Sequence, residues 1–432
     1  MSRVVYDLSR LTTRVLNPTP NGIDWIDRLL ADHFLRDRSD QTQSLMFGPA
    51  GPRVFAPGLL QNPTDALVRQ WDAPPAAPDL LVEALLAPIS RGRAATRLDF
   101  APPGRARRIA GAISAYGLKR GANPVAAAPP GAIYLNATHY PLESARHAAW
   151  LDARPDIRPV FFIHDLLPVA TPDTFWRGEA ERHKRRLELL ARRGAAALVT
   201  SRTVADALAE HMQRLGRQNL PIFQSHPPVA PIFGAPCQPD PRLQGTSYFV
   251  TCGTIEPRKN HALLVDVWRR FVAEQGPSAP KLVVVGKRGW NFTQIVEALA
   301  DPALGGAVIE VAGLSNGGWR ALLAGAAALL APSFAEGYGL PLAEALTAGA
   351  PALCSNIAPF QEIGGEAAIY LDPRLPGEWA ARIMDFAAPG SAARAEALRR
   401  VAARRPVEAE VYLADLDAFL ADISRRDENR DD

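Results

Sequence analysis

The sequence predicts an α/β protein with two domains, each built on a doubly wound parallel sheet. Three observations support this fold class. At 432 residues the chain is too long for one ordinary hydrophobic core. Short apolar runs, typical of buried parallel strands, alternate with helical patterns, above all in the second half. Between the halves lies a proline-rich stretch, residues 227–245, as expected of a linker.

We divide the chain on this basis. Residues 1–235 are expected to form the first domain and 236–246 the linker. Residues 247–410 then form the second domain, and 411–432 a C-terminal helix with a charged tail.

Composition narrows the function classes. The chain is 47% hydrophobic and 22% charged, as in soluble globular proteins, and its net charge of +3 is too small to favour a nucleic-acid partner. Cys237, Cys252 and Cys354 are odd in number and lack metal-ligand spacing, which favours free thiols. No apolar run reaches the roughly 18 residues of a transmembrane helix, and the N-terminus lacks an apolar signal region. We therefore expect a cytoplasmic protein, with peripheral contact to the inner face of the membrane left open.

The first half contains several expected strands. They lie at residues 3–8, 42–47, 132–136, 159–165, 195–201 and 221–226. Residues 50–130 show no clear pattern. An amphipathic helix follows Gly22, with apolar side chains at Ile26, Leu29, Leu30 and Phe34. Gly22, at this loop-to-helix junction, is either a point of close backbone approach to a ligand or a plain turn glycine.

His164 is the strongest candidate residue of the first half. It ends the apolar run 159–163, and ligands of parallel sheets bind beyond the carboxyl ends of the strands. His139 follows a similar strand in a longer loop and is a weaker candidate. The basic helix 178–193 is either a solvated face or a contact for an anionic membrane surface or for an acceptor's pyrophosphate. The Asp415-Leu416-Asp417 sequence lies in a helix, so we expect a solvated face there and no metal site.

The second half alternates strands and helices regularly. Strands are expected at residues 248–253, 281–286, 308–313, 327–332, 351–355 and 368–371. This order predicts a parallel sheet with right-handed crossovers. After the strand 327–332 come Gly337 and Gly339, and then a helix that begins near Pro341. A strand, a glycine turn and a helix N-terminus together favour an anion such as phosphate.

Two glutamates flank this turn. Glu344 lies one helical turn, about 5 Å, into the helix, where a carboxylate can accept hydrogen bonds from the ribose hydroxyls of a nucleotide. Glu336 precedes the turn, closer to any group beyond the diphosphate. Arg258 and Lys259 follow the strand that ends at Gly253 and reach the same edge of the sheet. A guanidinium fork and a compact ammonium are well suited to bind a diphosphate.

The sequence resembles retaining glycosyltransferases of family 4, with the GT-B fold of two Rossmann-like domains facing each other across a cleft. The resemblance rests on residues 253–261 (GTIEPRKNH), 285–290 (VGKRGW) and 332–344 (PSFAEGYGLPLAE). Weaker matches lie at residues 6–11, 134–136 and 164–168, and residues 50–130 are covered least.

The resemblance implies roles for individual residues. Arg258 and Lys259 neutralise the departing diphosphate of the donor, Glu344 holds the ribose, Glu336 lies by the donor sugar, and His164 approaches the reacting centre from the other domain. The roles at the diphosphate, the donor sugar and the reacting centre mark His164, Arg258, Lys259 and Glu336 as catalytic. The expected donor-binding residues are Gly22, Gly253, Arg258, Lys259, Arg288, Trp290, Gly337, Tyr338, Gly339, Leu340 and Glu344.

The function implied is transfer of a hexose from a nucleotide diphosphate sugar, with GDP-mannose favoured and UDP-sugars open. The acceptor would be a saccharide or a lipid-linked saccharide in the synthesis of exopolysaccharide, capsule or lipopolysaccharide. Family members retain the anomeric configuration, usually explained by a front-side displacement, and no metal or other cofactor is implied. Thr254 and Trp25 replace basic residues found in many relatives. They motivate the alternative of an inactive relative that binds a nucleotide sugar and supports a partner enzyme.

A third class, nucleotide-sugar epimerases and dehydrogenases, carries a Gly-x-Gly-x-x-Gly sequence after its first strand. None follows Val4-Val5-Tyr6 in this chain, so this class is disfavoured.

Overall fold

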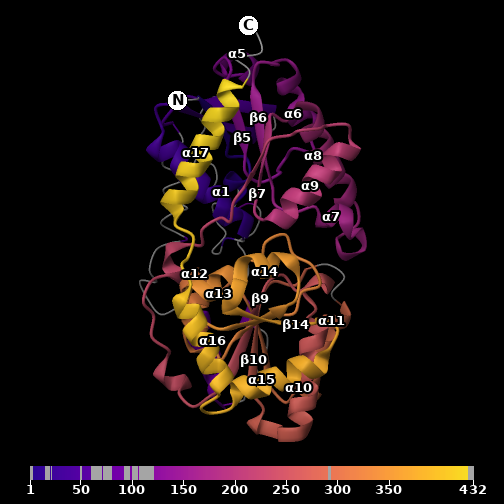
Figure 1. Ribbon diagram of the computed structural model, residues 1–432, viewed down its shortest axis with the longest axis vertical. Helices are drawn as coiled ribbons and strands as arrows, with labels where there is room; N and C mark the ends of the chain where they lie inside the picture. The colour runs from indigo at the N-terminus through magenta and orange to yellow at the C-terminus, as the bar shows by residue number, and fades with distance from the viewer. Residues whose placement is uncertain are drawn as a thin grey trace.

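The computed structural model has two lobes stacked along the long axis of the molecule, each containing a seven-stranded sheet (Figure 1). The two-domain α/β prediction is therefore confirmed. The structure describes residues 3–14, 20, 22–48, 51–59, 71, 80–91, 98–99, 106, 121–289 and 293–426.

The sheet of the N-terminal lobe has the order β3-β2-β1-β5-β6-β7-β8. Its strands are β1 (Val4–Asp7), β2 (Thr42–Gly48), β3 (Gly51–Phe55), β5 (Ile133–Asn136), β6 (Arg158–Ile163), β7 (Ala196–Val199) and β8 (Ile222–Gln224). The strand pairs are parallel except that β3 runs antiparallel to β2, from Ser44 opposite Phe55 to Gly48 opposite Gly51. The six expected strands are present, and β3 was not anticipated because it lies in the stretch without a clear pattern.

Helices cover both faces of this sheet. They are α1 (Gly22–Asp32), which continues as the π-helical turn η2 (His33–Asp37), α5 (Pro124–Ala127), α6 (Ala145–Asp152), α7 (Leu167–Ala170), α8 (Glu179–Arg193) and α9 (Arg202–Arg214). The interior of the sheet is apolar. Val5, Leu135, Phe161 and Val199 are all fully buried, which fits strands covered on both faces.

The sheet of the C-terminal lobe has the order β14-β13-β12-β9-β10-β11-β4. Its strands are β9 (Tyr248–Cys252), β10 (Lys281–Val285), β11 (Val308–Ala312), β12 (Leu329–Ala331), β13 (Ala352–Ser355), β14 (Ala368–Leu371) and β4 (Leu98–Asp99). All the pairs are parallel. Its helices are α10 (His261–Gln275), α11 (Thr293–Leu299), α12 (Asn316–Gly325), α13 (Leu340–Thr347), α14 (Ala358–Gly364), α15 (Pro376–Ala387) and α16 (Ala392–Ala403).

A segment from the first half of the sequence packs on the C-terminal lobe. The strand β4 adds to the free edge of β11, and α3 (Leu80–Arg91) packs on α12 and β11. Leu85 and Ile89 of α3 are fully buried, and Glu83 receives both arms of the Arg242 guanidinium at 2.8 Å. The sequence division placed this segment in the first domain, because residues 50–130 offered no pattern from which to assign it.

The last helix returns to the N-terminal lobe. The helix α17 (Ala409–Arg425) lies along that lobe (Figure 1), and its Phe419 ring contacts Phe223 of β8. Asp417 lies 3.1 Å from His33 Nε2 and 2.6 Å from an Arg38 nitrogen. The expectation of a solvated face is therefore wrong for Asp417, which ties α17 to the first lobe, whereas Asp415 is exposed.

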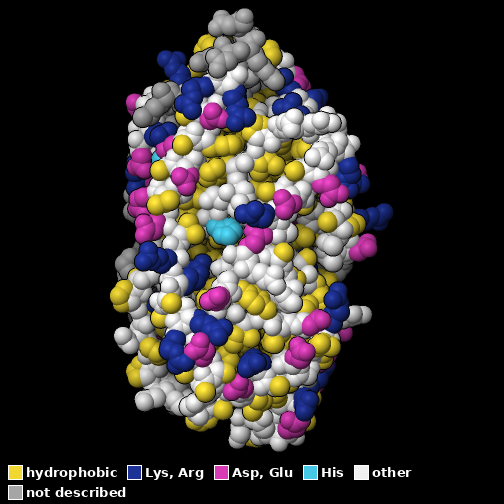
Figure 2. Space-filling view, viewed as in Figure 1, with side chains coloured by type: hydrophobic (Ala, Val, Ile, Leu, Met, Phe, Trp, Pro, Cys, Tyr) yellow, Lys and Arg dark blue, Asp and Glu magenta, His cyan; other side chains and the backbone are white. Residues whose placement is uncertain are grey.

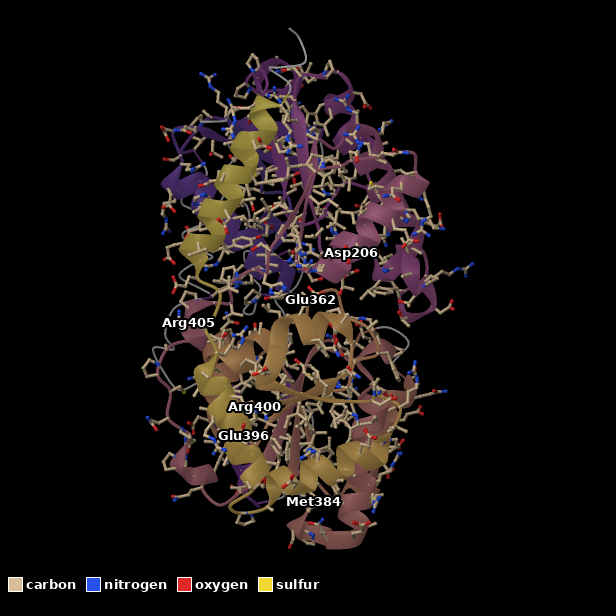
Figure 3. All side chains as sticks on the ribbon, viewed as in Figure 1. Asp206, Glu362, Met384, Glu396, Arg400 and Arg405 are labelled. Carbon is tan, nitrogen blue, oxygen red and sulfur yellow. The ribbon has the colours of Figure 1, made fainter. Side chains whose placement is uncertain are left out.

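A carboxylate joins the two lobes. Glu362 of α14 accepts hydrogen bonds from the backbone N–H groups of Arg202 (2.7 Å) and Thr203 (2.9 Å) at the start of α9, and from the Thr203 hydroxyl. Figure 3 shows Glu362 on the edge of the C-terminal lobe that faces α9 and Asp206. The dipole of α9 favours a negative charge at this end, so the contact holds the lobes together.

We predict that Glu362→Ala loosens the arrangement of the lobes. Three hydrogen bonds to a carboxylate are lost, at a cost on the order of 2–4 kcal/mol to the associated state. Small-angle scattering should show a larger radius of gyration than in the wild type. Asp206→Ala, an exposed carboxylate on α9, is the control and should change nothing. Identical scattering from Glu362→Ala and wild type would contradict the prediction.

The surface carries charges of both signs. On the face shown in Figure 2, Lys and Arg side chains are interspersed with Asp and Glu over both lobes. In the part of the chain that the structure describes, the helices are all too short or too polar to cross a membrane.

Candidate active site

A cavity with a volume of about 490 Å³, within the range of small-molecule sites, lies between the lobes. Both lobes contribute to its wall. The N-terminal lobe supplies Arg14, Gly22, Asp24, Trp25, His164, Asp165 and Thr200, among others. The C-terminal lobe supplies Cys252, Gly253, Thr254, Arg258, Lys259, Gly286, Lys287, Ser315, Asn316, Trp319, Glu336, Gly337, Tyr338, Gly339, Leu340 and Glu344, among others.

The loop between β12 and α13 is shaped by its two glycines. Gly339 occupies the N-cap of α13 with φ +107°, and a Cβ there would lie 2.5 Å from the Phe360 ring. A Cβ on Gly337 would lie 2.6 Å from both the His164 carbonyl oxygen and the Asp165 Cβ. The Gly337 carbonyl also accepts a hydrogen bond of 2.8 Å from the Ser201 hydroxyl. Glycine at 337 therefore allows this loop to lie directly against the other lobe, and glycine at 339 allows it to pack on α14 of its own lobe.

Gly22 makes the same kind of approach from the opposite side. It begins α1 and lines the cavity, and a Cβ at this position would lie 3.2 Å from the Leu340 side chain at the start of α13. The helix N-termini of α1 and α13 therefore both border the cavity. Their unpaired N–H groups favour an anion there.

Arg258 and Lys259 share one acidic partner. They lie in a short 3-10 turn, η6 (Pro257–Lys259), that follows β9. Each places a nitrogen 2.6 Å from Glu336, Arg258 on Oε2 and Lys259 on Oε1. Arg258 also donates to Glu256 at 2.6 Å. Burial alone raises the pKa of Glu336, but the charges of Arg258 and Lys259 overcome this and lower it to about 2.

Neighbouring backbone supports the basic pair. Gly253 (φ +147°) lies against the Lys259 side chain, since a Cβ there would be 3.0 Å from its Cε. Asn260, at the N-cap of α10, has φ 55°, and its side-chain amide donates to the carbonyls of Pro332 (3.1 Å) and Pro373 (2.9 Å). This links the basic turn to the end of β12.

Glu344 lies in the wall of the cavity, one turn into α13. Its Oε2 accepts a hydrogen bond of 2.9 Å from the indole Nε1 of Trp319. Burial raises the pKa of Glu344 to about 8, and the hydrogen bond from Trp319 offsets only part of this rise. At neutral pH the free protein therefore holds this carboxyl largely protonated.

His164 borders the cavity as a neutral imidazole. Its Nε2 lies 2.8 Å from the Ala137 carbonyl, which can only accept, so Nε2 carries the proton. Burial lowers the pKa of His164 to about 4. The ring stacks on Phe162 with centroids 4.4 Å apart, and the backbone N–H donates to His139 Nε2 at 3.0 Å. His139 therefore supports the strand end that carries His164.

Two predicted donor-binding residues need comment. Arg288 does not line the cavity: its guanidinium is held by the Glu310 carboxylate of β11, with nitrogens 2.9 and 2.8 Å from the two oxygens. A buried carboxylate on the neighbouring strand thus takes this guanidinium away from the site. Trp290 lies outside the described residues. The other predicted residues all border the cavity.

Tyr338 lines the cavity, and its hydroxyl binds backbone of the segment that joins the lobes. Its hydroxyl donates to the Pro227 carbonyl at 3.1 Å, and Trp25 Nε1 donates to the Pro228 carbonyl at 2.9 Å. Trp25, one of the departures from the family pattern, therefore anchors α1 to the segment that joins the lobes. Thr254, the other departure, lines the cavity.

Among the residues of the cavity that sequence reasoning missed, Asp165 and Trp319 are the most informative. Asp165 follows His164 and faces Arg258, Lys259 and Glu336 closely enough to feel their charges, although burial raises its pKa. Its position after a candidate strand end could have identified it. Trp319 gave no such indication, because its partner Glu344 lies 25 residues away in sequence. Within the described part of the chain, no three His, Cys, Asp or Glu side chains form a group that could hold a metal ion.

Known proteins share part of this sequence, and others share its fold. A family model described as glycosyl transferases group 1 matches residues 246–388, which lie in the C-terminal lobe. The whole chain has the GT-B fold of the Anabaena protein HepE, solved in complex with UDP-glucose. The TM-score is 0.55 at 12% identity, over 98% of this chain and 100% of that one. Sucrose-phosphate synthase from Thermosynechococcus elongatus has a TM-score of 0.55 at 14% identity, over 93% and 94% of the two chains.

Among curated proteins, two Escherichia coli enzymes illustrate the relationship. The serotype-specific mannosyltransferase WbdA is 28% identical over 242 residues, 53% of this chain and 29% of that protein. O-antigen chain mannosyltransferase B is 31% identical over 132 residues, 31% of this chain and 34% of that protein. The chain thus spans about a third of the length of these two relatives.

Proposed function

We propose that this protein is a retaining glycosyltransferase that transfers a hexose from a nucleotide diphosphate sugar to a saccharide or lipid-linked saccharide acceptor in cell-surface polysaccharide synthesis. The observation that carries the proposal is the shared cavity. It brings together Arg258, Lys259, Glu344 and two helix N-termini, one from each lobe, which are groups suited to bind a diphosphate and its ribose.

The chemistry follows from the charges. In the free protein Glu336 balances the cations of Arg258 and Lys259. A diphosphate brings negative charge to the same cations, and that charge grows on the leaving oxygen as the sugar departs. Preorganised cations stabilise such a transition state more than the ground state. Glu336, 7% exposed and ionised, then lies beside the sugar, where it favours an oxocarbenium-like state.

A front-side displacement agrees with this arrangement, because it needs no protein nucleophile. His164 is neutral at working pH, so its proposed role is to contact the sugar or the acceptor through hydrogen bonds rather than through charge. The reaction is proposed to need no metal, since the two cations supply positive charge at the diphosphate. Undiminished transfer in the presence of EDTA is the expected result.

GDP-mannose is the favoured donor, because both curated relatives described above are named mannosyltransferases. UDP-sugars remain open, and HepE was solved with UDP-glucose. Peripheral contact with the inner face of the membrane is proposed for α8. Its exposed cations include Lys184, Arg185 and Arg192, and the half-buried Arg182 lies over the exposed Trp176 ring at 3.8 Å. Co-sedimentation with anionic but not neutral vesicles tests this contact.

A donor screen tests the function. Purified protein should gain about 2.7 kcal/mol of stability at a hundredfold excess of its donor over Kd. Among GDP, UDP, ADP and their sugars, one base should dominate in a thermal-shift assay. Transfer or hydrolysis of that donor distinguishes the enzyme from a relative that binds without turnover. No stabilisation by any of these compounds would refute the proposal.

A further inference from the structure

Trp319 lies beside Glu344 in the wall of the cavity. It lies in the first turns of α12, whose N-terminus is capped by Ser315 through a 2.9 Å hydrogen bond from Gly318 N–H. The Trp319 side chain is 5% exposed, and its Nε1 donates to Glu344 Oε2 across the boundary between α12 and α13. This single contact fixes one oxygen of the Glu344 carboxyl.

The second oxygen of the Glu344 carboxyl, Oε1, has a different environment. No donor among the residues that the structure describes reaches Oε1, and this atom is not among the buried polar atoms that lack a partner. Because Glu344 lines the cavity, Oε1 is the oxygen left for a ligand. A carboxylate held at one oxygen by a rigid indole presents the other in a single orientation.

The other titratable groups near Glu344 do not compete with it. Cys252 of β9 and Tyr338 of the preceding loop are the near ones, and burial raises the pKa of each above its usual value. Lys259, which lines the same cavity, is paired with Glu336. A change of charge near neutral pH in this part of the cavity therefore belongs to Glu344.

We propose that Trp319 is a positioning residue that orients Glu344 toward the ribose hydroxyls of the donor and favours the carboxylate that receives them. This inference rests on the proposed function. Ribose hydroxyls donate to an ionised carboxylate, so binding of the donor releases the proton that Glu344 holds in the free protein. Donor affinity should therefore rise with pH until Glu344 is ionised in the free protein.

The test measures Kd for the nucleotide sugar selected by the donor screen, between about pH 6 and pH 9. Its diphosphate is esterified at both ends and keeps a constant charge over this range. Wild-type affinity should rise to a plateau above about pH 8. Trp319→Phe keeps the ring and loses the N–H, so Kd at neutral pH should be about tenfold weaker. The rise should also move to higher pH, and Glu344→Gln should show no rise.

Trp268→Phe is the matched control. Trp268 is fully buried in the same lobe and donates its Nε1–H to the Pro280 carbonyl at 2.7 Å, away from the cavity. The Trp268→Phe variant also loses one indole hydrogen bond, but its Kd and pH profile should be those of the wild type. A wild-type Kd and profile in Trp319→Phe would overturn the inference while the proposed function stands. Absence of any nucleotide-sugar binding by the wild type would instead refute the proposed function.

A second measurement needs no folded variant of Trp319. Of the eight indole ¹⁵N–¹H resonances of the wild type, one should shift with pH near 8 and lose this shift in Glu344→Gln. The same resonance should move when the nucleotide sugar is added. Eight resonances that are all insensitive to pH in this range would overturn the inference.

Discussion

Arg258→Ala and Lys259→Ala are each expected to reduce kcat by about 10²–10³-fold while the protein stays folded. Each cation lies 2.6 Å from Glu336 in the free protein and is proposed to stabilise the leaving diphosphate. Loss of one preorganised charge partner at a developing anion costs about 3–4 kcal/mol of transition-state stabilisation. The measurement is single-turnover transfer with saturating donor, which separates the chemical step from binding.

The control for these variants is Arg270→Ala. Arg270 lies on the exposed side of α10, paired with Glu274 at 2.7 Å, and does not line the cavity. It should retain wild-type turnover. Activity within a fewfold of wild type in both Arg258→Ala and Lys259→Ala would remove the proposed leaving-group role from this pair.

Gly337→Ala is the second substitution with a large expected effect. The added methyl would lie 2.6 Å from the His164 carbonyl oxygen, a backbone atom that cannot rotate away. The lobes must then separate by a fraction of an ångström to about 1 Å, and the reacting groups move apart. A misplacement of this size costs about 100-fold in rate. Initial rates should fall by that order, and donor binding to the C-terminal lobe should change less.

The matched control is Gly377→Ala. Gly377 lies in the first turn of α15, and a Cβ there would have no heavy atom within 4 Å. It should leave both turnover and stability unchanged. If Gly337→Ala turned over as fast as Gly377→Ala, close contact between the lobes would not be required for the reaction.

Much of the fold could be predicted because its determinants are local. The apolar strands of the C-terminal lobe, and the turn at Gly337 and Gly339, follow from patterns within a few residues. The helix that begins after Gly339 placed Glu344 correctly, one turn into α13. By contrast, β4 joins the second lobe by pairing with β11, more than 200 residues along the chain, and α3 packs on α12 and β11. No periodicity reveals such a contact.

In the site, too, local sequence patterns predicted some features and missed others. Arg258, Lys259 and Glu336 border the cavity as expected, but their mutual ion pairs were not foreseen. Arg288 looked similar to Arg258 in sequence, but its guanidinium is held by Glu310 on the adjacent strand. Whether a guanidinium lines the site depends on which carboxylates lie near it in the folded chain. Local sequence patterns do not reveal these contacts.

The central claim is that the cavity between the lobes binds a nucleotide diphosphate sugar with its diphosphate at the basic turn. A crystal structure of the donor complex tests it most directly. We predict diphosphate oxygens within hydrogen-bond distance of Lys259 Nζ and the Arg258 guanidinium, with the ribose hydroxyls on Glu344. A nucleotide bound with its diphosphate away from both cations, or outside this cavity, would contradict the account.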